Sequence, residues 1–143
     1  MNTIPFKIIE INTEKFVLAG TQAVFDENID VNTNFSFGVN ATSQLVRCVM
    51  DYTYVYKGKE ILNMVLSCVF KIEEEAFGSM LQDGKFILEP FISRYLATIN
   101  VGAARGEIHA RCEIQSSPLS KIILPPINLV EALPAPITII LNK

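Results

Sequence analysis

The chain has 143 residues, enough for one domain with one hydrophobic core, and we expect residues 1–143 to form such a domain. Half of the residues are hydrophobic and only 19% are charged, against about 25% in a typical soluble domain, so we expect apolar surface to be buried between copies or against partners. A net charge of −3 without a Lys/Arg run disfavours nucleic-acid binding, and no apolar run approaches the roughly 18 residues that membrane insertion needs.

The N-terminal part of the chain is predicted to be extended. Residues 1–5 lack the basic start and apolar segment of a signal peptide, so we expect a cytoplasmic protein. Residues 6–18 predict a strand that is interrupted by a polar run at 12–15 and closed by Gly20. Residues 21–34 mix turn formers and acids with isolated apolar residues. They predict a long crossover, after which a second strand begins near Phe35.

The clearest local pattern is the alternation of apolar and polar side chains over residues 46–56 and 62–72. Apolar side chains occupy the even positions of both segments. Because opposed residues of a hairpin share one side of the sheet, the paired numbers must sum to an even value. A two-residue turn at 58–59 would give odd sums, so we predict either a three-residue loop at 57–59 or a bulge that restores parity. In this register Cys48 lies opposite Cys68.

From about Pro90 the apolar spacing becomes helical, and Pro90 suits a first turn because its missing N–H has no partner to lose. We expect the helix to continue to about Cys112. A stripe at steps of three and four begins at Leu88 and Ile92 and supplies the candidate oligomer-interface residues Tyr95, Ile99, Ala103, Gly106 and Ala110. The small residues at its lower half would let another backbone approach, either the sheet or the same helix of a second copy.

The segment Leu124-Pro125-Pro126-Ile127-Asn128-Leu129 is an apolar loop stiffened by two prolines. Loops are normally polar because their backbone groups need water, so this loop predicts a surface that something covers. Glu131 could open a last short helix, which Pro134 and Pro136 limit. Residues 137–141 predict a short strand or an extended arm.

Reactive groups are sparse. His109 is the only histidine, and a lone histidine in a helical stretch is more often structural than catalytic. A nucleophile pair is conceivable only with Cys112, which has no evident orienting third group. The chain has three cysteines, which cannot all pair with one another and lie far apart in the sequence: Cys48, Cys68 and Cys112. This favours buried, reduced thiols. Without a phosphate-binding, nucleophile-elbow or metal motif, we expect no catalysis, no metal and no cofactor.

Two features in succession are the most specific: a proline-initiated helix that reaches Arg105-Gly106, and the apolar loop 124–129. Weaker matches are Phe6-Lys7-Ile8, Val24-Phe25-Asp26 and the run 68–72 followed by Phe77. In this order they resemble the SecB export-chaperone family over residues 6–132. The resemblance implies an α+β fold, a four-stranded antiparallel sheet with one long helix packed on a face, assembled into a dimer or a dimer of dimers.

The resemblance also implies an ATP-independent holdase that keeps unfolded precursor polypeptides competent for export and hands them to the SecA motor. Clients would lie in apolar grooves between the crossover, the long helix and the final segment. Each groove candidate could instead close the core; the candidates are Val24, Phe25, Ile29, Phe77, Met80, Leu124, Pro125, Ile127 and Leu129.

Two departures from the family pattern leave other functions open. Residues 107–119 make the region before the apolar loop longer, and the C-terminal part, broken by Pro134 and Pro136, lacks the final helix and acidic tail through which SecA would dock. A SecB-like chaperone that guards the antitoxin of a toxin–antitoxin pair is one alternative. The others are a carrier with an enclosed cavity for a small apolar ligand and a structural subunit without a client.

Overall fold

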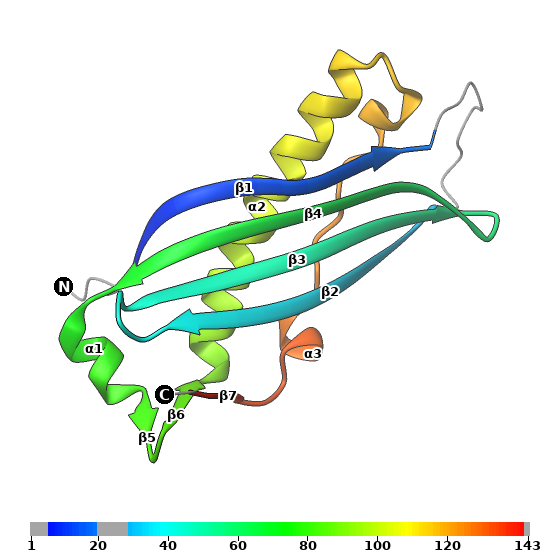
Figure 1. Cartoon of the computed structure of the whole chain (residues 1–143). Coiled ribbons are helices and arrows are strands. Elements are labelled where there is room, and N and C mark those ends of the chain that lie inside the picture. Colours follow the sequence, from blue (N-terminus) through cyan, green and yellow to red (C-terminus); the bar gives the residue numbers. More distant parts are fainter. Residues whose placement is uncertain (1–5, 20–28, 142–143) are drawn as a thin grey trace.

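The computed structural model describes residues 6–19 and 29–141, so the groove candidates Val24 and Phe25 lie outside the described residues. Its main layer is a four-stranded antiparallel sheet in the order β1-β4-β3-β2 (Figure 1). The strands are β1 (Phe6–Leu18), β2 (Ile29–Asn40), β3 (Leu45–Tyr56) and β4 (Lys59–Ile72). The long helix α2 (Pro90–Ile114) crosses one face of this sheet. The predicted α+β fold class is confirmed.

A second, smaller sheet was not anticipated from the sequence. It has the order β5-β6-β7 and lies at the N-terminal end of α2 (Figure 1). Its strands β5 (Leu81–Gln82) and β6 (Lys85–Leu88) follow α1 (Glu74–Ser79), and β7 (Ile137–Ile140) is the strand expected near the C-terminus. Between α2 and β7 come the 3₁₀ helix η1 (Pro118–Lys121) and α3 (Leu129–Ala132), which ends before Pro134. Among the described helices, none is long and apolar enough to span a membrane.

The pairing of β3 with β4 confirms the predicted register, with Cys48 opposite Cys68. The turn itself has two residues, Lys57 and Gly58, with φ of 51° and 77°. Both positions need positive φ in the tight hairpin turn whose twist matches the strands. Parity is then restored by a bulge, because Tyr54 pairs with Leu62 while Val55 pairs with Glu60. Of the two predicted solutions, the bulge is therefore the one that occurs.

The prediction that the second strand begins near Phe35 is wrong. β2 begins at Ile29 and pairs with β3 along its whole length. Its even-numbered side chains include Asn32, Asn34 and Ser36, and they form an exposed polar row. Asparagine is typical of turns, so residues 21–34 predict a crossover, although 29–34 belong to the strand.

The predicted stripe on α2 meets the buried face only at its start, where Ile92 is buried. The buried face includes Leu96, Ala97, Asn100, Ala104 and Ile108, whereas Tyr95 is 38% exposed and Gly106 and Ala110 are exposed. A Cβ added at Gly106 would meet no neighbouring atom within 4 Å. Gly106 and Ala110 of the small half therefore do not pack against the sheet, whereas Ala103 is half-buried and packed against the core. The sheet-facing side of α2 is not apparent from the sequence, because alanine, serine and asparagine interrupt the apolar repeat on that side.

Asn100 fixes α2 to the middle of the sheet. This side chain is fully buried, and its Nδ2 donates hydrogen bonds to the carbonyls of Cys48 at 3.1 Å and Leu66 at 3.0 Å. Its Oδ1 accepts a hydrogen bond of 2.8 Å from the Tyr52 hydroxyl. Buried polar groups are costly unless they are satisfied, so this network specifies one position of the helix across β3 and β4.

Candidate functional site

After α2 the chain turns back along the helix as residues 118–133, which we call the strap (Figure 1). Arg105 lies in the middle of α2, where its Nε donates a hydrogen bond of 2.8 Å to the carbonyl of Leu124 and its Nη2 one of 3.3 Å to that of Pro125. Arg94, three turns earlier, donates from Nε to the carbonyl of Leu133 at 2.9 Å. These bonds attach the strap by its main chain, in addition to the strap side chains that are buried in the core.

The strap side chains divide into anchors and displayed groups. Leu119, Leu124 and Leu133 are buried, with exposed fractions of 1%, 2% and 7%. Between these anchors Ile123 is 53% and Val130 is 65% exposed, and the two prolines of the loop are exposed as well. The strap therefore presents apolar side chains to solvent from a backbone that two prolines and two arginines hold in place.

The groove candidates of the strap lie at different depths. Leu124 belongs to the core, Pro125 is exposed, and Ile127 and Leu129 are half-buried and packed against the core. Ile29 is also half-buried, at the start of β2 opposite Tyr56.

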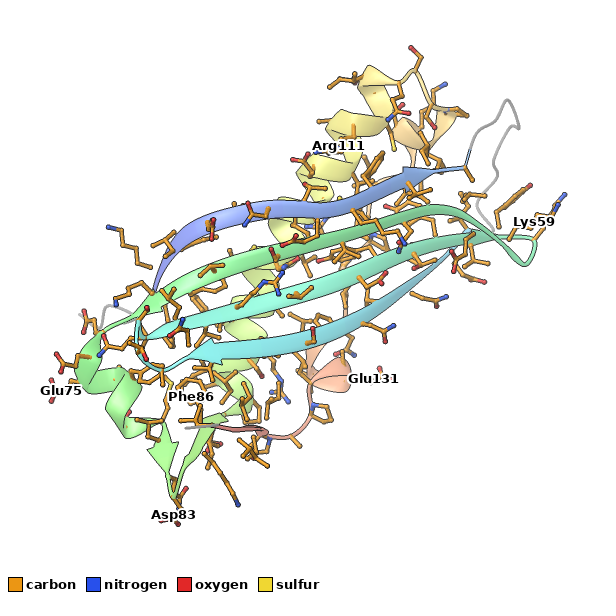
Figure 2. The ribbon with its side chains drawn as sticks, viewed as in Figure 1. Lys59, Glu75, Asp83, Phe86, Arg111 and Glu131 are labelled. Carbon is orange, nitrogen blue, oxygen red and sulfur yellow. The ribbon has the colours of Figure 1, made fainter. Side chains whose placement is uncertain are left out.

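Phe77 and Met80 are buried at the other end of α2. The Phe77 ring stacks on the ring of Phe86 at 4.8 Å between centroids, beside α1 (Figure 2). Met80 lines an open pocket of about 340 Å³ with Phe91 and Ile92 of the first helical turn. From there to Arg105 is roughly 20 Å along the axis at the usual helical rise. The structure does not bring these two residues together with the loop at 124–125.

A second apolar surface lies on the opposite flank of α2, and we call it the β1–α2 face: Phe6, Ile8, Ile11, Phe16, Tyr95, Ile99 and Ala103. Its two ends are marked by the Phe6 and Tyr95 rings, 6.3 Å apart, and by the Arg111 guanidinium 5.3 Å from the Phe16 ring, where α2 passes β1 (Figure 2). Between them Ile8 and Ile11 are 38% and 53% exposed. Both pair with buried β4 residues, Phe70 and Cys68, so they point to the helix side of the sheet.

The environment of the thiols does not favour nucleophilic chemistry. Burial raises the pKa of Cys48 to about 12 and that of Cys68 to about 11, and it also raises the pKa of Cys112. A reactive cysteine needs the opposite shift. His109 lies near Cys112 in sequence, but its Nδ1 makes a hydrogen bond of 2.9 Å with the carbonyl of Ser120 in the strap. These surroundings favour structural roles for the three cysteines and for His109.

The residues that sequence reasoning missed are polar. Arg105 was part of the recognised motif without a role, and Arg94 and Asn100 were not singled out. Two features of the sequence point to the arginines. A spacing of 11 residues places both on one side of a helix. The apolar segment that follows contains prolines, so it has more backbone carbonyls to satisfy than N–H groups of its own.

No protein-family model matches the chain, and no curated protein matches it. Among solved structures, the fold is similar to that of the SecB-like chaperone Rv1957 of Mycobacterium tuberculosis, solved in complex with a ChAD peptide from the Rv1956 HigA1 antitoxin. The TM-score is 0.53 at 15% sequence identity, over 87% of this chain and 91% of that chain. The chain has a SecB-like fold. The predicted resemblance is thus confirmed for the arrangement of sheet, helix and returning segment.

Proposed function

We propose that this protein is a molecular chaperone, an ATP-independent holdase that binds unfolded or precursor polypeptides through the displayed apolar side chains of the strap. The observation that carries the proposal is the attachment of the strap by main-chain carbonyls to Arg94 and Arg105, which leaves Ile123 and Val130 exposed. The similarity in fold to a chaperone solved with a bound antitoxin peptide supports it.

A holdase has to accept many sequences, so it favours broad apolar contact over fixed polar recognition. An exposed isoleucine and an exposed valine on a fixed backbone provide contact of this kind. The prolines of the strap reduce the conformational entropy that would otherwise be lost when a client binds.

The β1–α2 face is the surface we propose for self-association into a dimer or tetramer. It combines exposed isoleucines of β1 with the flank of α2 that carries Tyr95, Ile99 and Ala103. Gly106 and Ala110 are exposed beside it, so a second helix could approach closely there.

The proposal leaves two cellular roles to compare, antitoxin binding and protein export. Binding of an antitoxin in a toxin–antitoxin system is favoured by the peptide held by the structural neighbour, whereas export with hand-over to SecA rests on the family resemblance alone. The small-ligand carrier is less favoured. Three pockets lined by described residues, beside Met80, Gly38 and Ile139, have volumes of about 340, 320 and 380 Å³, and all three open to solvent. The cytoplasmic location stays a prediction.

The test is native mass spectrometry of the purified chain with and without an unfolded polypeptide, paired with aggregation suppression in the absence of nucleotide. We expect an oligomer that captures the polypeptide. Val130→Asp should weaken capture about tenfold, since a charge in an apolar contact is costly. Val17→Asp, the same change at a 50% exposed position on the other face of the sheet, is the matched control and should have no effect. A monomer that neither binds nor protects the polypeptide would contradict the proposal.

A further inference from the structure

The two edge strands of the main sheet are built differently. The pairing of β1 with β4 shifts twice, between Ile8 and Glu10 and between Thr13 and Lys15, and four charged side chains lie along the strand. β2 pairs with β3 over all 12 residues without a shift and carries a single charge, Asp30. Bulges and charges are the devices by which proteins prevent an edge from pairing with another strand. β1 has both devices, whereas β2 has no bulge and only the one charge of Asp30.

The hydrogen bonding at the start of β3 shows which groups β2 turns to its free side. Ile72 donates its N–H to the carbonyl of Gln44 at 3.0 Å, while Leu45 pairs with Lys71. In an antiparallel ladder this places Leu45 in a pair that does not bond to β4, so its own N–H and C=O point to Asn40 of β2. Asn40 and every second residue before it therefore bond to β3. The alternate residues direct N–H and C=O to the free edge: Ile29, Val31, Thr33, Phe35, Phe37 and Val39.

Among the described residues, no backbone hydrogen bond of β2 leaves its ladder with β3. The outward N–H and C=O groups are left to water or to another strand. Their side chains lie on the helix side, where Phe35 and Phe37 are half-buried, and the other side of the strand shows the polar row of Asn32 and Asn34. An added strand would therefore meet apolar neighbours on one side and polar neighbours on the other.

We infer that the free edge of β2 binds an extended client segment by strand addition, antiparallel to β2. The inference rests on the proposed function and states how the main chain of a client is held. Every unfolded polypeptide carries the same main-chain donors and acceptors, so an edge of this kind recognises clients without regard to sequence. The occupant is a client rather than a second copy because the apolar surface suited to self-association lies at the other edge, on the β1–α2 face.

The geometry selects the kind of segment. Opposed residues of neighbouring strands share a side of the sheet, so client residues opposite Phe35 and Phe37 face the helix side and are expected to be apolar. The same residues exchange main-chain hydrogen bonds with β2, whereas the alternate, polar residues of the client point their N–H groups away.

The first test measures binding of a fluorescent peptide of about 12 residues, the length of β2, that alternates apolar and polar side chains, to the intact chain. N-methylation of the apolar residues removes the N–H groups that meet β2, and it should weaken binding at least about tenfold. N-methylation of the polar residues should change the affinity less than about twofold. Equal effects in the two peptides would overturn strand addition while leaving the holdase proposal intact; no binding of the unmodified peptide, together with no aggregation suppression, would reject the holdase itself.

The second test changes the protein. Thr33→Pro removes one outward N–H and no ladder bond, and edge strands tolerate such a substitution. It should weaken the binding of the unmodified peptide about three- to tenfold. Thr33→Val, which keeps the N–H, is the matched control and should bind as the parent chain does. If Thr33→Pro instead dissociates the oligomer and leaves peptide affinity unchanged, the edge is filled by a second copy and the inference is wrong. Should this variant not fold, the methylated peptides still decide.

Discussion

The two flanks of α2 meet the rest of the molecule in different ways. On the sheet side, Leu96, Ala97 and Ala104 are completely buried, and Asn100 adds a satisfied polar network to β3 and β4. On the strap side, Arg94 and Arg105 bond to main-chain carbonyls, and the apolar side chains of the strap alternate between buried and exposed. The first contact holds the fold together. The second fixes a backbone while leaving several of its side chains exposed, which is what the proposed function requires of the strap.

The largest effect is expected on the sheet side. Leu96→Ala removes a completely buried side chain and should lower the free energy of unfolding by about 2–5 kcal/mol, through lost burial and the cavity left behind. Ile114→Ala, at an 82% exposed position of the same helix, should change it by less than about 0.5 kcal/mol. Urea unfolding followed by circular dichroism measures both. Similar losses in the two variants would show that α2 is not held by its sheet face.

The polar network gives the next effect, with a matched pair of tyrosines. Tyr52→Phe leaves the buried Asn100 Oδ1 without its 2.8 Å donor and should cost about 1–3 kcal/mol of unfolding free energy. The Tyr54 hydroxyl is buried and has no hydrogen-bond partner among the described residues, so Tyr54→Phe should be neutral or slightly stabilising. Thermal unfolding of the two variants measures both changes in stability. A larger loss at Tyr54 than at Tyr52 would contradict the assigned network.

The smallest effect on stability, and the largest on binding, is expected on the strap side. Arg105→Met removes both hydrogen bonds to the loop, and water can replace them, so the loss should be about 1 kcal/mol or less. Amide exchange of residues 122–130 should accelerate and client capture should fall, because the displayed side chains lose their fixed position.

Arg47→Met serves as the control, since Arg47 pairs with Glu14 on the opposite face of the sheet at 2.8 Å. This variant should lose a similar or smaller amount of stability and keep client capture. Equal loss of capture in Arg47→Met and Arg105→Met would contradict the special role of the strap attachment.

The sequence predicted the elements whose pattern is strict. Alternation gave β3 and β4 with the Cys48–Cys68 register, and parity alone required the bulge or longer loop. Sequence patterns mislead where polar residues belong to regular structure. The asparagines of β2 predict a crossover, and Asn100 interrupts the apolar repeat on the sheet face of α2. The small second sheet joins β6 to β7, about 50 residues later, and no local pattern predicts such a pairing. The apolar strap was recognised from its prolines, but its attachment through Arg94 and Arg105 is visible only in three dimensions.

Photo-crosslinking from the strap tests the central claim most directly. A benzoylphenylalanine at Ile123, which is 53% exposed on the strap, is compared with one at Val17, which is 50% exposed on the other face of the sheet, during incubation with an unfolded polypeptide. The account predicts strong crosslinking from position 123 and only background from position 17. Background crosslinking from position 123, or equal yields from the two positions, would show that clients do not use the strap.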